Sequence, residues 1–164
     1  MILTIAVVAL LVLASYFGWS YIHEMSHIFM AKKRVGVEKY ELKIFPHVDP
    51  VAGFRFAACR YWMSKEPTDE DKAWISIAPR FPGVLAAFMF VLTGFTSGWL
   101  ALIWAIFWGA GLVDMFVGSL GISQYSDLQK AAKGFGRVPL MFRLVGAATI
   151  VISVLATALF YFGG

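Results

Sequence analysis

Long uncharged stretches and short polar ones follow one another along this chain of 164 residues. Residues 1–22 and 144–164 carry no charged side chain, and neither does the stretch 81–113, which is too long for a single crossing of a membrane. A membrane-spanning helix needs about 20 mainly apolar residues. A turn at residues 93–98, where two glycines occur, would divide the long stretch. We therefore predict four membrane-spanning helices, covering roughly residues 2–31, 74–93, 98–120 and 138–162.

The sizeable polar region of the chain, residues 35–72, lies between the first two predicted helices. Apolar and charged residues alternate over residues 40–44, which is the period-two pattern of a half-exposed strand. A break at residues 45–50 contains two prolines, and residues 53–59 indicate a second strand. The predicted fold is an all-α polytopic membrane protein with one small β-hairpin between helices 1 and 2. Residues 1–164 are expected to form a single membrane-embedded domain.

Composition and charge agree with this prediction and orient the chain. Hydrophobic residues make up 60% of the sequence, and the mean hydropathy is +0.74, which is typical of a small polytopic membrane protein. Lysine and arginine gather at residues 32–34 and 130–137 and are missing from the turn near residue 96. By the positive-inside rule, both termini lie outside the cytoplasm and both large loops inside it. The net charge of +4 is interleaved with acidic residues, which argues against nucleic acid as a partner and fits a multi-pass protein of the cell membrane.

The first predicted helix ends in a motif that suits zinc chemistry, His23-Glu24-Met25-Ser26-His27. Positions i and i+4 of a helix share a face, so both imidazoles can reach one Zn²⁺ ion per chain. Glu24 lies beside that position and can act as a general base. Ionisable residues in a membrane span are costly and indicate function. The alternative is a structural one, in which two histidines lie at the interface and the glutamate extends towards water.

A catalytic zinc site has three protein ligands, so a third ligand must come from elsewhere in the chain. Asp114 and Asp127 both lie on the cytoplasmic side of the third predicted helix, and topology permits either. Asp127 could instead cap a helix together with Ser126. Cys59 is interpreted as a small strand residue, and His47, in a turn next to Pro46, as a solvent-exposed side chain.

The second predicted helix contains an unusual sequence, Ala78-Pro79-Arg80-Phe81-Pro82-Gly83. Two prolines and a glycine loosen a helix and free backbone carbonyl groups, which is tolerated in a membrane where neighbours or water satisfy them. Arg80 is expected at about the depth of the zinc motif. It could pair with Asp114, which we favour, or lie near a scissile carbonyl group as an electrostatic stabiliser.

In these features the chain resembles the site-2 protease family of intramembrane zinc metalloproteases. The resemblance rests on the HEMSH motif, the short loop with predicted strands, the proline-containing second helix and a late aspartate. It is closest to a compact branch in which a small residue precedes Asp-Leu, here Ser126-Asp127-Leu128. The resemblance implies that His23, His27 and Asp127 are the zinc ligands and that Glu24 is the catalytic base.

The resemblance also implies hydrolysis of peptide bonds in or near the transmembrane segments of membrane proteins, with the site inside the bilayer near its cytoplasmic face. The partners would then be a membrane protein or peptide substrate and the lipid bilayer. A different class remains open, a zinc-binding membrane transporter or a catalytically silent scaffold. So does a membrane zinc protease that cuts prenylated or soluble peptides.

Overall fold

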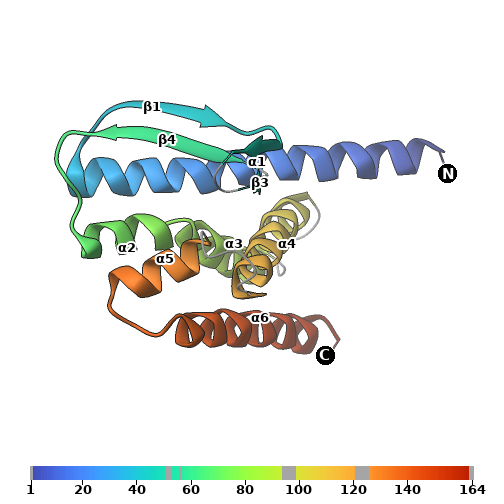
Figure 1. Ribbon diagram of the computed structural model, residues 1–164. Helices are drawn as coiled ribbons and strands as arrows, with labels where there is room; N and C mark the ends of the chain where they lie inside the picture. The colour runs from blue at the N-terminus through green and yellow to red at the C-terminus, as the bar shows by residue number, and fades with distance from the viewer. Residues whose placement is uncertain (1, 51–52, 56, 94–98, 121–125, 163–164) are drawn as a thin grey trace.

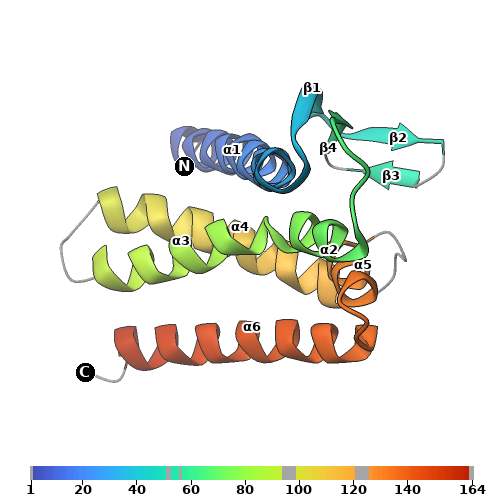
Figure 2. The same ribbon diagram turned by 90° about the vertical axis from the view of Figure 1, so that its left-hand side faces the viewer.

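Six helices and four short strands make up the part of the chain that the structure describes. This computed structural model describes residues 2–50, 53–55, 57–93, 99–120 and 126–162. The elements are α1 (Ile2–Val35), β1 (Val37–Lys43), β2 (His47–Asp49), β3 (Gly53–Arg55), β4 (Ala58–Met63), α2 (Asp69–Ile77), α3 (Arg80–Thr93), α4 (Trp99–Leu120), α5 (Asp127–Gly134) and α6 (Pro139–Phe162). They form layers, with α1 and the strands on one side, α2 to α5 in the middle and α6 on the other side (Figures 1 and 2).

Helix α1 runs past its predicted end at residue 31 and reaches Val35. Its 34 residues extend over about 51 Å, which exceeds the roughly 30 Å of a bilayer's hydrocarbon core. The basic side chains of Lys32, Lys33 and Arg34 occupy the last turn, where positive charge complements the helix dipole. Gly36 then adopts a φ of 73°, the left-handed conformation that commonly ends helices, and turns the chain back.

The strands return along α1 and do not stay at its end. β1 pairs antiparallel with β4, and the short strands β2 and β3 pair within the connection between them. The Tyr16 hydroxyl donates to the carbonyl of Ile44 at 3.4 Å, and the rings of Phe17 and Phe45 are 5.2 Å apart. The predicted hairpin is therefore present, and it covers the C-terminal half of α1 (Figure 1). The second predicted strand, residues 53–59, corresponds to two separate strands, and residue 56 lies outside the described part.

The second predicted helix is two helices. α2 begins with a capping box in which the Thr68 hydroxyl accepts from the amide of Asp71, so the helix starts before the predicted residue 74. It ends at Ile77, and α3 begins at Arg80. Pro79 separates the two because it has no amide hydrogen and its ring would clash with the carbonyl group one turn earlier.

The remaining helices close the bundle against α4. α4 and α6 match their predicted ranges to within one residue, and the predicted turn at residues 94–98 lies outside the described part. Helix α5 was not predicted, and it packs on α2. The guanidinium group of Arg143 donates to the carbonyl groups of Ser119 and Leu120, both at 2.8 Å. These bonds satisfy the C-terminal carbonyls of α4 and fix the start of α6 beside it.

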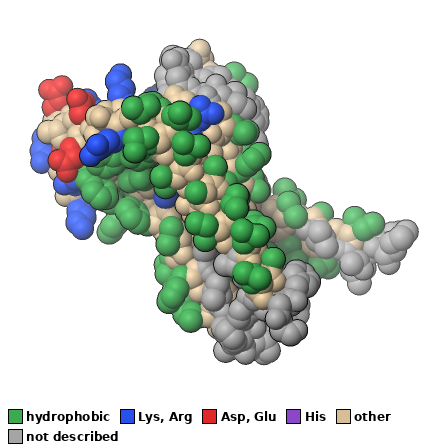
Figure 3. Space-filling view, turned by 90° about the horizontal axis from the view of Figure 1, so that it is seen from below, with side chains coloured by type: hydrophobic (Ala, Val, Ile, Leu, Met, Phe, Trp, Pro, Cys, Tyr) green, Lys and Arg blue, Asp and Glu red, His purple; other side chains and the backbone are tan. Residues whose placement is uncertain are grey.

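Four helical segments are long and apolar enough to cross a membrane, which makes the chain compatible with a multi-pass membrane protein. Their outer faces carry exposed leucine, valine, isoleucine and phenylalanine. Figure 3 shows the charged side chains gathered towards one end and hydrophobic side chains over the rest of the visible face. Such a distribution is typical of a surface that contacts lipid over most of its length.

The close packing of α5 on α2 gives a test of the fold. A Cβ atom on Gly134 would meet the backbone carbonyl of Asp69 and would lie 2.8 Å from the Cβ of Ala73. We expect Gly134→Ala to lower the free energy of unfolding by roughly 1–3 kcal/mol, seen as a lower Tm in detergent. Gly109→Ala is the control, since a Cβ there meets nothing within 4 Å. Equal Tm values for the two variants would contradict this packing.

Candidate metal centre

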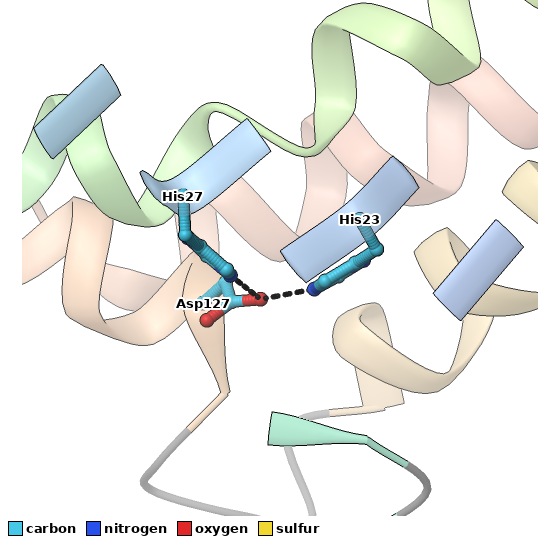
Figure 4. Close-up of side chains that lie close together, drawn as sticks. All are labelled: His23, His27 and Asp127. Carbon is cyan, nitrogen blue, oxygen red and sulfur yellow. Dashed lines mark hydrogen bonds and ion pairs between the residues drawn. The ribbon is translucent and has the colours of Figure 1, made fainter. Parts of the chain in front are cut away.

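Two histidines of α1 and one aspartate of α5 converge on a single point. His23 and His27 lie one turn apart, with ring centroids 5.1 Å from each other. The Oδ2 atom of Asp127 is 3.2 Å from the Nε2 atom of His23 and 3.4 Å from that of His27. Figure 4 shows both rings pointing towards this carboxylate. The three ligand atoms lie within 4.8 Å of one another.

These spacings fit a tetrahedral zinc ion. Nitrogen and carboxylate oxygen ligands bind zinc at about 2.0–2.1 Å, so neighbouring ligand atoms of a tetrahedral site lie roughly 3.3 Å apart. The distances from Asp127 Oδ2 to the two imidazole nitrogens are 3.2 and 3.4 Å. A donor set of two imidazoles and one carboxylate leaves the fourth position open, as in catalytic zinc sites. His23, His27 and Asp127 could therefore hold such an ion with little rearrangement.

Asp127 reaches this point because Ser126 takes over the capping of α5. Ser126 is the N-cap residue, and its hydroxyl accepts from the amide of Gln129 at 3.4 Å. The carboxylate of Asp127, the first residue of the helix, is thus free to face α1. Burial opposes its ionisation, but His27 and His23 outweigh burial and hold the pKa of Asp127 well below its usual range. The expected alternative of a helix cap at these two residues is confirmed for Ser126, whereas Asp127 is the first residue of the helix.

The orientation of His27 depends on the break between α2 and α3. Its Nδ1 atom lies 2.7 Å from the carbonyl oxygen of Ile75, and a carbonyl can only accept, so Nδ1 donates and Nε2 is the nitrogen that faces Asp127. In a continuous helix the Ile75 carbonyl would accept from the amide of residue 79, which is Pro79 and has no hydrogen to donate. The proline therefore frees the carbonyl group that orients a candidate ligand.

The orientation of His23 depends on Asp114, which lies on the other side of its ring. The Nδ1 atom of His23 is 3.1 Å from Asp114 Oδ2, and Arg80 Nη1 donates to the same oxygen. Asp114 thus contacts the imidazole nitrogen that faces away from Asp127. It orients the His23 ring from that side and is not part of the cluster of His23, His27 and Asp127. The pairing of Arg80 with Asp114, expected from the sequence, is confirmed.

Glu24 is buried beside the cluster, with 8% of its surface exposed. It lines the same cavity as the two histidines and Asp127. Burial and the neighbouring Glu24 carboxylate raise the pKa of the Cys59 thiol. Among the described residues, the candidate metal-binding group contains neither Cys59 nor His47.

Strand residues that the sequence interpretation left without a role also face the centre. The cavity, about 1110 Å³ in volume, is lined by Arg55, Cys59 and Tyr61 in addition to the cluster. Burial and the charges of Cys59, Asp127 and Glu24 raise the pKa of Tyr61 to about 12. The period-two pattern that predicted the strands could have placed these residues on one face, but it could not show that this face is turned towards α1.

Comparisons with models of protein families, with curated proteins and with solved structures found no match to this chain.

The ion pair behind His23 gives a stability test. Asp114→Ala would leave Arg80 buried without its partner, and we expect it to lower the free energy of unfolding by about 3 kcal/mol. Adding Arg80→Leu should recover part of that loss, because the two side chains are coupled. Urea or thermal unfolding in detergent measures both effects.

A surface pair serves as the control for this cycle. Arg34 Nη2 lies 3.0 Å from Glu70 Oε1, and 67% of the Glu70 side chain is exposed. Glu70→Ala should therefore cost less than about 1 kcal/mol. Strictly additive effects of the Asp114 and Arg80 substitutions would show that the buried pair does not stabilise the bundle.

Proposed function

We propose that this protein is a zinc-dependent metalloendopeptidase that hydrolyses peptide bonds in or near the transmembrane segments of membrane proteins. The main support is the convergence of His23, His27 and Asp127 at distances that suit tetrahedral zinc. The buried carboxylate of Glu24, next to the first histidine in the chain, adds a group that can carry protons.

Each residue of the centre has a role in this proposal. The two histidines and Asp127 would hold a zinc ion, which would supply Lewis-acid chemistry to the scissile carbonyl group and the attacking water. Glu24 takes the proton of that water and returns it to the nitrogen of the leaving amine. The Ile75 carbonyl and the Asp114 carboxylate hold the two imidazoles by Nδ1, so that both Nε2 atoms would be available to a zinc ion.

The level of the centre along the helices supports a substrate at the membrane boundary. His23 follows the uncharged stretch of α1, Arg80 precedes that of α3, and Asp114 ends that of α4. The contacts among these three side chains hold the ends of the uncharged stretches at one depth. We infer that this depth is the cytoplasmic side of the bilayer, with both termini outside, because lysine and arginine concentrate beyond it.

The cavity suits a chain that arrives partly from the membrane. Leu11 of α1 and Ile106 of α4 line it among the uncharged stretches, while Ser126 and Lys130 of α5 line it on the polar side. A helical substrate hides its amide groups in internal hydrogen bonds, so it must unwind locally before attack. The polar end of the cavity offers hydrogen-bonding groups to the backbone of such an unwound segment.

A zinc-binding transporter or a silent scaffold is the rival in another class. A transporter is expected to carry ionisable groups along a path through several spans. The spans of this chain are uncharged outside the polar level, over residues 1–22, 81–113 and 144–164. A peptidase acting on prenylated or soluble peptides would use the same centre and differ only in its substrate.

Substitutions within the centre test the chemistry directly. Glu24→Gln should keep stoichiometric zinc and abolish cleavage of a membrane-tethered reporter, because it removes the proton acceptor and no ligand. His23→Ala and Asp127→Ala should lose both zinc binding and cleavage. The Tm of the metal-free protein should change far less than these two activities do. Metal analysis of the purified protein and reporter cleavage in liposomes give the two readouts. Substantial cleavage by Glu24→Gln would exclude this mechanism, and zinc transport without any cleavage would favour the rival class.

The proline between α2 and α3 gives a subtler test. In Pro79→Ala the new amide can bond to the Ile75 carbonyl, in competition with His27 Nδ1. We expect zinc affinity to fall about 10- to 100-fold, as for other groups that orient metal ligands, without a lower Tm. Pro82→Ala is the control, because Pro82 lies in the first turn of α3 and leaves the Ile75 carbonyl untouched. Competition with a chelator measures the affinities, and equal values for both variants would contradict this role.

A further inference from the structure

The strand segment from β3 to β4 presents every second residue to the cavity. Arg55, Ala57, Cys59 and Tyr61 all line it, whereas Arg60, between the last two, is exposed on the opposite face. Within β4, the opposite faces of Arg60 and Tyr61 follow from strand geometry. The segment is therefore a wall of the cavity with a cation at one end.

Among the described residues, the charges around the cavity leave Arg55 without an ion-pair partner. The lining includes three carboxylates and three basic side chains, namely Glu24, Asp114, Asp127, Arg55, Arg80 and Lys130. Arg80 is paired with Asp114, whereas Arg55 and Lys130 make no ion pair within the described residues. The Nε atom of Arg55 is buried and has no hydrogen-bond partner there. Because the six charges cancel, a bound divalent ion would leave the cavity with a net positive charge.

We propose that Arg55 binds a carboxylate of the peptide substrate, with Lys130 adding a weaker attraction at the rim. This inference rests on the proposed peptidase function and names its substrate class, a peptide with an acidic group close to the scissile bond. A guanidinium group binds a carboxylate through two parallel hydrogen bonds, which gives both affinity and orientation. Lys130 shares a helix face with Asp127, three residues earlier. Because the Lys130 side chain is exposed, water weakens its attraction for the substrate carboxylate.

The chain limits how far the acidic group can be from the reacting bond. Cys59 is a neighbour of the Glu24 carboxylate, and Arg55 precedes it by four residues. Four residues span at most about 14 Å, so an extended substrate must carry its carboxylate within about five residues of the scissile bond. An acidic residue further away should have no effect.

The test compares matched substrates with the zinc-loaded protein in liposomes. Membrane-tethered reporters carry a single glutamate or glutamine at successive positions, and kcat/KM is measured for each pair. We expect glutamate to be preferred about tenfold at one or two positions within five residues of the cut. Arg55→Gln should reduce this ratio to about 1, and Arg55→Glu should favour lysine at the same positions. Arg60→Gln, which removes the charge of the exposed neighbour, should keep the preference.

Further arms identify the source of the anion. Loss of the preference on amidating a short substrate's C-terminus, with no effect of internal glutamate, would assign the carboxylate to the chain end. A preference that persists in Arg55→Gln, or equal cleavage of both reporters by the unaltered protein, would overturn the inference. An Arg55 effect that follows the fraction of anionic lipid in the vesicle, and not the substrate, would do the same in favour of lipid binding.

A binding arm separates this inference from the peptidase function. Zinc-loaded Glu24→Gln protein is titrated with fluorescent acidic and neutral peptides, so that no cleavage is needed. Tighter binding of the acidic peptide that disappears on adding Arg55→Gln supports the carboxylate site, even if no reporter is ever cut. Equal binding of the two peptides overturns it, even if Glu24-dependent cleavage is observed.

Discussion

The buried pair between Arg80 and Asp114 sets the depth at which this bundle changes from apolar to polar. The two side chains are only 11% and 24% exposed, and neither charge is tolerable alone among apolar helices. Helices α3 and α4 must therefore pack so that the start of one meets the last part of the other. His23 contacts the same carboxylate at 3.1 Å, so α1 is held at this level too. The three long apolar segments share one register because the ionisable residues that bound their uncharged stretches bind one another.

Two polar groups of the centre, the Ile75 carbonyl and the Asp127 carboxylate, come from places where the helices are interrupted. Pro79 ends the continuity between α2 and α3, and the carbonyl of Ile75 becomes free to accept from His27. Ser126 starts α5 and satisfies its first amides, which leaves the carboxylate of Asp127 facing the histidines. Regular apolar helices keep their backbone groups internally bonded and could not offer these contacts. The same irregularities thus terminate helices and orient the candidate ligands.

The sheet forms one wall of the cavity, which differs from the apolar helix surface that lines another part of it. The chain turns back at Gly36 into β1, and β1 and β4 lie along the C-terminal half of α1, so the polar half of that helix is covered by protein. The face of β4 that carries Cys59 and Tyr61 lies over the centre, and the other face, with Arg60, is exposed. A substrate bound in the cavity would contact apolar helix surface at one end and this strand wall at the other. Under the proposed function, residues of this wall outside the candidate metal cluster would select the peptide.

Local patterns in the sequence determined a large part of this protein. The uncharged stretches predicted the four long apolar segments, because a span requires about 20 apolar residues whatever surrounds it. The spacing of His23 and His27 placed both imidazoles on one helix face, because the helical period depends only on neighbouring residues. The depth of Arg80 and Asp114 was sufficient to predict their pairing, since each buried charge requires a partner.

Tertiary structure alone decided how the pieces of the centre meet. Asp114 and Asp127 were both topologically acceptable as third ligands, and they lie 91 and 104 residues from His23 in the chain. Only the packing of α4 and α5 against α1 places one carboxylate at Nδ1 and the other at Nε2. The division of residues 74–93 into two helices and the packing of α5 on α2 were likewise not predicted. Each depends on contacts between distant segments, and hydrophobic periodicity records only which side of an element is buried, not what buries it.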